Sequence, residues 1–134
     1  MSNYLLDTNV ISELARKSPN PSVLDFFETI DDITMSVVTL EEIEFGIERL
    51  PASQRKTLLK WWSALLSLPP IIIPVEEKIA KLAGQLRARQ ESKGRSKSQA
   101  DMLIAATAIS NGLILVTRNT KDFYELGVSV LNPF

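Results

Sequence analysis

The sequence contains no cysteine and no histidine. Without cysteine there are no disulfides and no thiolate nucleophiles, and without histidine there is no imidazole to shuttle protons or bind zinc. Any catalysis must therefore use carboxylates, hydroxyls, Lys or Arg, or a metal ion held by oxygen ligands. Oxygen-only sites favour Mg²⁺ or Mn²⁺.

A strong charge imbalance is also missing, because 15 basic residues face 16 acidic ones. No global field draws such a chain toward nucleic acid or an anionic membrane, so any such binding must be local. The longest apolar runs fall far short of the roughly 20 residues that cross a bilayer, and no secretion signal is recognisable. We therefore expect a soluble, cytoplasmic protein with no membrane association.

The length of 134 residues, 45% of them hydrophobic, predicts one domain spanning residues 1–134. Strand-like runs alternate with helical patterns along the whole chain. This alternation predicts an α/β fold with three layers, α/β/α, around a mostly parallel central sheet of about four to five strands. The predicted strands are 4–6, 33–38, 71–73, 113–117 and 128–131, and the main predicted helices are 10–15, 40–50, 75–91 and 99–111.

Some of these elements have a predicted position in the sheet or the core. Prolines flank the run 71–73, which places it near a sheet edge. The run 113–117 has the character of a central strand. The helix 99–111 is apolar on nearly every face, so we expect it to be buried, with Asn111 and Gly112 at its C-terminal end.

Acidic or amide residues recur where predicted strands and helices join. Asp7 ends the first strand, and Glu42, Asp101 and Asn119 stand at similar junctions, the last with Asp122 close by. The carboxyl ends of parallel strands lie at one edge of a sheet, where such side chains can converge. We therefore expect these residues to form one site.

Each of these residues also has an ordinary explanation as a helix cap. Asp7 can cap the following helix, Thr39 to Glu42 fits a capping box, and Ser98 to Asp101 has the same form. Taken together, however, clustered carboxylates raise one another's pKa unless a cation compensates. A site of several acids without Lys or His at its centre indicates a metal ion.

Four motifs carry a resemblance to a known family. They are LLDTNVISE at 5–13, SVVTLEEI at 36–43, ADMLIAATA at 100–108 and VTRN at 116–119. In this order and over nearly the whole chain, they resemble the motifs of PIN-domain ribonucleases, specifically the VapC-type and FitB-type toxins of bacterial type II toxin–antitoxin systems.

The resemblance implies metal-dependent hydrolysis of RNA phosphodiester bonds with Mg²⁺ or Mn²⁺. The family's three acids fall on Asp7, Glu42 and Asp101, and its fourth acidic position falls on Asn119, with Asp122 as an alternative. Asp7 and Asp101 are then the principal metal ligands. Glu42 is a further ligand or orients the attacking water, and Asn119 supports the site from outside.

The resemblance also implies partners. These are an RNA substrate, a second copy of the chain in a homodimer, and a cognate antitoxin that inserts an Arg side chain into the acidic pocket. A larger complex that binds operator DNA through the antitoxin is part of the same expectation. The surfaces expected to receive the antitoxin are apolar grooves between the helices at 23–27 and 40–50.

Positive groups for the RNA phosphates have two candidate sources. One is Arg118, beside the proposed site. The other is a basic run that also fits a solvated helix end and loop. The adjacent Trp61 and Trp62 either stack on bases or, as part of an amphipathic helix, fill the core or a subunit interface. The basic run consists of Arg87, Arg89, Lys93, Arg95 and Lys97.

Two further hypotheses compete with the nuclease. In one, the same fold binds RNA or protein but has lost cleavage, because Asn119 replaces an acid. In the other, the chain is a receiver-type phosphoacceptor, which needs an active-site lysine after a late strand, for which Lys121 is available.

Overall fold

The computed structural model describes residues 3–134, and its five strands all pair in parallel. Hydrogen bonds join three of them in the order β1-β4-β5 and the other two as β2-β3. Strand β2 lies next to β1, so the two sheets adjoin. The strands are β1 (Tyr4–Leu6), β2 (Thr34–Ser36), β3 (Ile71–Ile73), β4 (Ile114–Val116) and β5 (Val130–Leu131).

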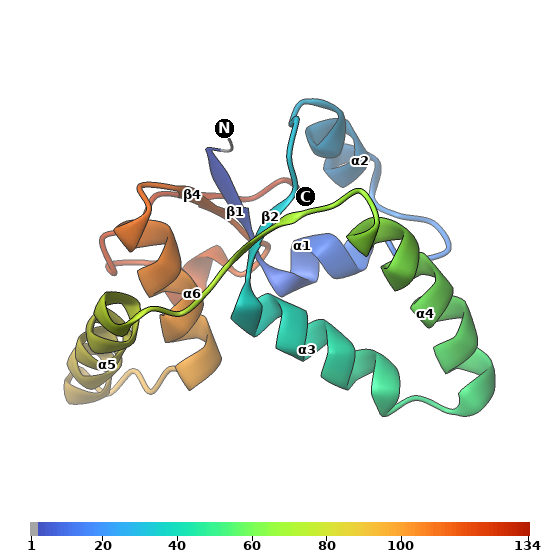
Figure 1. Cartoon of the computed structure of the whole chain (residues 1–134). Helices are drawn as coiled ribbons and strands as arrows, with labels where there is room; N and C mark the ends of the chain where they lie inside the picture. Colours follow the sequence, from blue (N-terminus) through green and yellow to red (C-terminus); the bar gives the residue numbers. More distant parts are fainter. Residues whose placement is uncertain (1–2) are drawn as a thin grey trace.

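Helices cover both faces of the strands, which confirms the predicted three-layer α/β/α class (Figure 1). On one face lie α5 (Glu77–Ser92) and α6 (Gln99–Ser110). On the other face lie α1 (Thr8–Glu13), α2 (Pro21–Glu28), α3 (Val37–Glu48) and α4 (Ala52–Leu66), and a short 3-10 helix, η1 (Thr120–Phe123), follows β4.

Each face has its own hydrophobic core, because successive side chains of a strand point in opposite directions. Leu5 of β1 and Leu115 of β4 pack with α5 and α6. Their neighbours Leu6 and Val116 pack with the helices of the other face. The sheet is therefore buried on both sides, as the continuous apolar strands predict.

The predicted places of two strands within the sheet are confirmed. Strand β3 pairs only with β2 among the described strands, which makes it an edge strand, and β4 pairs on both sides and is central. Helix α6 has six fully buried or nearly buried residues, and Asn111 is its C-cap residue. The next residue, Gly112, adopts a positive φ of 62°, the backbone geometry for which glycine is suited.

The predicted start of α3 is wrong. The helix begins at Val37 and not after Thr39, because the Ser36 side chain accepts a hydrogen bond from Val38 N at 3.0 Å and caps the helix there. Strand β2 consequently ends at Ser36. Thr39 is not a cap but a buried residue of the first turn, and Glu42 lies in the second turn. Helix α1 likewise starts earlier than expected, at Thr8.

Within residues 3–134, none of the helices has both the length and the apolar content needed to cross a membrane.

Two leucines allow the contribution of the core to be measured. Leu5 is fully buried in β1, whereas Leu68 is 70% exposed. We expect Leu5→Ala to lower the free energy of unfolding by about 2 to 5 kcal/mol, because it leaves a cavity between β1, α5 and α6. Leu68→Ala is the matched control and is expected to change it by less than about 0.5 kcal/mol. Urea denaturation followed by circular dichroism measures both, and equal effects would contradict this description of the core.

Candidate active site

Asp7 occupies the junction between β1 and α1 and is only 4% exposed. Its backbone N–H donates to Val116 O of β4 at 2.9 Å, which extends the β1-β4 pairing by one residue. Its carboxylate accepts hydrogen bonds from Thr8 N at 2.8 Å, from Thr117 Oγ1 at 2.8 Å and from Asn9 Nδ2 at 3.1 Å. Asp7 therefore caps α1, as predicted, and is also fixed by β4.

Glu42 reaches the same place from α3. Thr8 Oγ1 donates to Glu42 Oε1 at 2.6 Å, and it lies 3.2 Å from Oγ1 of the buried Thr39. These contacts connect the first turn of α1 to α3. Glu42 is consequently held by Thr8, the residue that directly follows Asp7.

Asp101 enters from the first turn of α6. Its backbone N–H donates to Ser98 Oγ, the N-cap side chain of that helix, at 3.0 Å. Burial raises the pKa of Asp101, and the negative charge of Asp122 raises it further. The Ser98 hydrogen bond and the positive charge of Lys97 act in the opposite direction. The Ser98 cap predicted from sequence is thus present.

The electrostatics of Asp7 connect the three acids. Burial is the main cause that raises the pKa of Asp7, and the negative charges of Asp101 and Glu42 raise it further. Hydrogen bonds from Thr117 and Thr8 lower it and oppose these effects in part. Asp101 and Glu42 thus both act electrostatically on Asp7, which directly follows the carboxyl end of β1.

Asn119 is placed differently. The residue is exposed, and its backbone N–H donates to Thr117 Oγ1 at 3.1 Å, whereas its side chain does not cap η1. Asn119 therefore reaches Asp7 through Thr117.

Asn9 is a site residue to which the sequence analysis gave no role. Its Nδ2 donates to Asp7 Oδ2, and its Oδ1 accepts from Arg118 N at 3.0 Å. It thus links the Asp7 carboxylate to the chain that follows β4. Two signals in the sequence point to it: its position two residues after Asp7 and its place within the motif LLDTNVISE at 5–13.

The cationic residues proposed to hold RNA are partly engaged within the protein. Arg95 forms an ion pair with Glu125, and Lys97 forms one with Asp122. The Arg118 guanidinium lies over the Phe134 ring, 4.8 Å from its centroid. Of the two tryptophans, Trp62 is buried in the core, which confirms the structural alternative for that residue.

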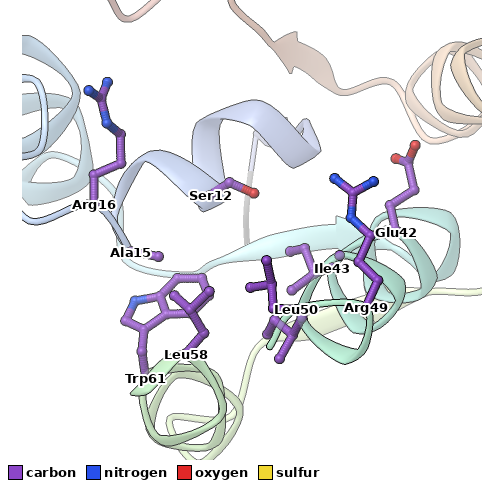
Figure 2. Close-up of a pocket in the computed structure, with 11 residues that line it drawn as sticks. Ser12, Ala15, Arg16, Glu42, Ile43, Arg49, Leu50, Leu58 and Trp61 are labelled. Atoms are coloured by element: carbon purple, nitrogen blue, oxygen red, sulfur yellow. The ribbon is translucent and has the colours of Figure 1, made fainter. Parts of the chain in front are cut away.

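An apolar groove has one of the three acids, Glu42, in its lining (Figure 2). It lies between α1, α3 and α4, and not between α2 and α3 as expected. The apolar side of α2 is directed inward instead, where Phe26 packs edge to face on Tyr4 with ring centroids 5.2 Å apart. The groove is lined by Ser12, Ala15, Arg16, Glu42, Ile43, Gly46, Ile47, Arg49, Leu50, Leu58 and Trp61.

The residues present suit a hard divalent cation in their chemistry. Among residues 3–134, no three acidic side chains are grouped closely enough to form a complete metal cage. Mg²⁺, however, is usually held by one or two carboxylates together with waters and substrate phosphates. Asp7, whose pKa is raised mainly by burial and further by the charges of Asp101 and Glu42, fits that mode of binding.

The fold and the site define a parallel α/β protein in which the buried Asp7 follows the carboxyl end of β1 and is acted on by the charges of Glu42 and Asp101. The family model described as "PIN domain" matches residues 4–128. The chain belongs to the PIN domain family.

Individual relatives match over nearly the whole chain. The chain is 34% identical to "Toxin FitB" of Neisseria gonorrhoeae, covering 97% of both chains. It is 32% identical to "VapC ribonuclease Y4jK" of Sinorhizobium fredii, covering 97% of this chain and 96% of the relative. The solved structure of FitAcB from Neisseria gonorrhoeae superposes with a TM-score of 0.86 at 33% identity, covering 97% of each chain. The match to this family leaves the receiver-type hypothesis without support.

The raised pKa of Asp7 predicts that this residue reduces stability at neutral pH. Because the folded state binds the Asp7 proton more tightly than the unfolded state, stability attributable to this group rises as the pH falls through its folded pKa. At a pH above that pKa, the ionised Asp7 carboxylate lowers the free energy of unfolding by the full cost of burying its charge. We therefore expect Asp7→Asn to raise the melting temperature at pH 7 by a few degrees and the difference to shrink in acid.

Asp25→Asn is the matched control, because Asp25 is exposed on α2. Thermal unfolding of the three proteins between pH 4 and pH 8 measures the effect. A destabilised Asp7→Asn variant at pH 7 would show that the charge of Asp7 contributes to stability, contrary to this prediction.

Proposed function

We propose that this protein is the toxin of a type II toxin–antitoxin system and acts as an endoribonuclease that uses Mg²⁺ or Mn²⁺ to hydrolyse RNA phosphodiester bonds in the cytoplasm. The observation that carries the proposal is the buried Asp7 carboxylate, on which the charges of Glu42 and Asp101 act, in a chain of the PIN domain family. The printed names of its relatives, a VapC ribonuclease and a FitB toxin, support it.

In this proposal each site residue has a distinct role. Asp7 and Asp101 would hold the metal ion, which would supply Lewis acidity toward water and the phosphoryl oxygens. Glu42 receives its Thr8 hydrogen bond on Oε1, and its other oxygen is left to accept a hydrogen bond from the attacking water. The attacking water would pass a proton to Glu42 as its oxygen forms the new bond to phosphorus, and the leaving oxygen would take up a proton from solvent as its bond to phosphorus breaks.

The remaining residues keep the carboxylates in place. Thr117 donates to Asp7 Oδ2, and the Asn119 backbone N–H donates to Thr117. We assign Asn119 this supporting role, and Asn9 a similar one through its bond to Asp7. Such supporting groups orient metal ligands and commonly affect activity when they are removed.

The proposal includes a protein partner. Solved structures similar to this chain include FitAB bound to a DNA fragment and DNA-bound VapBC from Salmonella typhimurium. We propose that a cognate antitoxin lays an apolar segment into the groove between α1, α3 and α4. Glu42 lies at one end of that groove, so an antitoxin Arg placed there can pair with a carboxylate of the site (Figure 2). We also expect a homodimer, and operator DNA binding through the antitoxin.

RNA cleavage by the purified chain tests the enzymatic part. We expect cleavage of single-stranded RNA with Mg²⁺ or Mn²⁺, its loss on chelation, and a decrease of roughly 100-fold or more for Asp7→Asn, since a site carboxylate is lost. Asp25→Asn should cleave as the parent does.

The result that would contradict the proposal is a folded parent protein that cleaves no RNA with either metal. If such a protein still binds RNA or an antitoxin but takes up no metal in calorimetry, the non-cleaving binding module is the better description.

A further inference from the structure

Lys97 differs from the other residues of the basic run 87–97. Its Nζ lies 3.2 Å from Asp122 Oδ1, and its side chain is only 21% exposed. It directly precedes Ser98, the N-cap residue of α6, so its backbone position is fixed by the start of that helix. A half-buried, paired lysine has a defined position, unlike a lysine on a solvated loop.

The loop that carries Lys97 is fastened at a second point. Arg95 pairs with Glu125, which lies just beyond η1, and Arg95 N donates to Gln90 O at 2.8 Å. Two ion pairs thus connect the loop at 93–98 with the segment that follows β4. The ammonium group of Lys97 is consequently held beside Asp122.

This position is inside the electrostatic field of the acidic site. The positive charge of Lys97 and the negative charge of Asp122 both act on Asp101, and Asp101 in turn acts on Asp7. The charges of Asp101 and Glu42 that act on Asp7 are both negative. A fixed cation therefore acts on Asp101, whereas the charged groups that act on Asp7 are carboxylates.

We propose that Lys97 is a permanent positive charge of the acidic site. Its ammonium group neutralises the Asp122 carboxylate, so that the divalent ion binds at Asp7 and Asp101 and not at Asp122. The inference rests on the proposed metal-dependent function and adds to it which acids are available to the ion. A divalent ion at Asp122 must either displace the ammonium group or approach it against repulsion.

Binding of Mn²⁺ to the full chain, measured by titration calorimetry at constant ionic strength, tests this role without reference to RNA cleavage. Lys97→Met removes the charge and keeps the length of the side chain. We expect it to bind Mn²⁺ roughly five- to tenfold more tightly than the parent, the order of effect of one unit charge on a nearby divalent ion. Lys97→Arg keeps the charge and is expected to bind as the parent does.

Two further variants separate the role of Asp122 from a general change in charge. Lys93→Met removes a charge from an exposed position of the same loop and is expected to have little effect, because solvent and salt screen it. The double variant Lys97→Met with Asp122→Asn removes both partners and should return the Mn²⁺ affinity to near that of the parent. Circular dichroism verifies that each variant is folded.

The inference is overturned if Lys97→Met and the parent have the same Mn²⁺ affinity, and equally if neither binds the ion. It is also overturned if Lys97→Met weakens RNA binding and leaves Mn²⁺ binding unchanged, because Lys97 is then a phosphate contact. A parent that binds no Mn²⁺ beside a Lys97→Met variant that does would support the role of Lys97 while the proposed function fails. If the parent binds Mn²⁺ and cleaves RNA but Lys97→Met has the same Mn²⁺ affinity as the parent, the proposed function stands and the role of Lys97 fails.

Discussion

Asp7 is a carboxylate that the fold removes from water and then surrounds with hydrogen-bond donors and two further acids. Ionising such a group is unfavourable, and the donors from Thr8, Asn9 and Thr117 offset part of that cost. These donors come from α1 and from the end of β4. Both of those elements must therefore be in place before the site exists, which ties the site to the packing of the central strands.

Placing a charge in this way is unfavourable for folding but useful for binding a cation. A carboxylate that is only 4% exposed, and on which the charges of Asp101 and Glu42 act, has little solvation to lose when an ion arrives. The rest of the fold supplies the compensating stability, since the two cores on either side of the sheet enclose Leu5, Leu6, Leu115 and Val116 completely. Stability and the acidic site thus come from the same short strands, which place apolar side chains in the cores and polar ones at their ends.

The sequence was sufficient for the fold class and for the places of β3 at an edge and β4 at the centre of the sheet, because hydrophobic periodicity and the parallel arrangement determine them. It failed at the β2-α3 junction, where Ser36 and Thr39 are both good caps and only the pairing of β2 with β3 decides between them. Asn9 and Lys97 were not recognised as members of the site for a related reason. Their roles depend on partners about 25 or more than 100 residues away, at Asp122 and Arg118, and no local pattern reports such contacts.

The alternation of Leu5 and Leu6 between the two cores has a consequence for how the chain tolerates insertions and deletions. Strand β1 is only three residues long and is followed at once by Asp7. A slip of one residue in its register against β4 would exchange the side chains that face each core, and it would also turn the carboxylate toward the opposite face of the sheet. Only the correct register of β1 fills both cores and places the Asp7 carboxylate at the site. A chain that misaligns its first strand therefore loses the packing of both cores together with the position of the carboxylate.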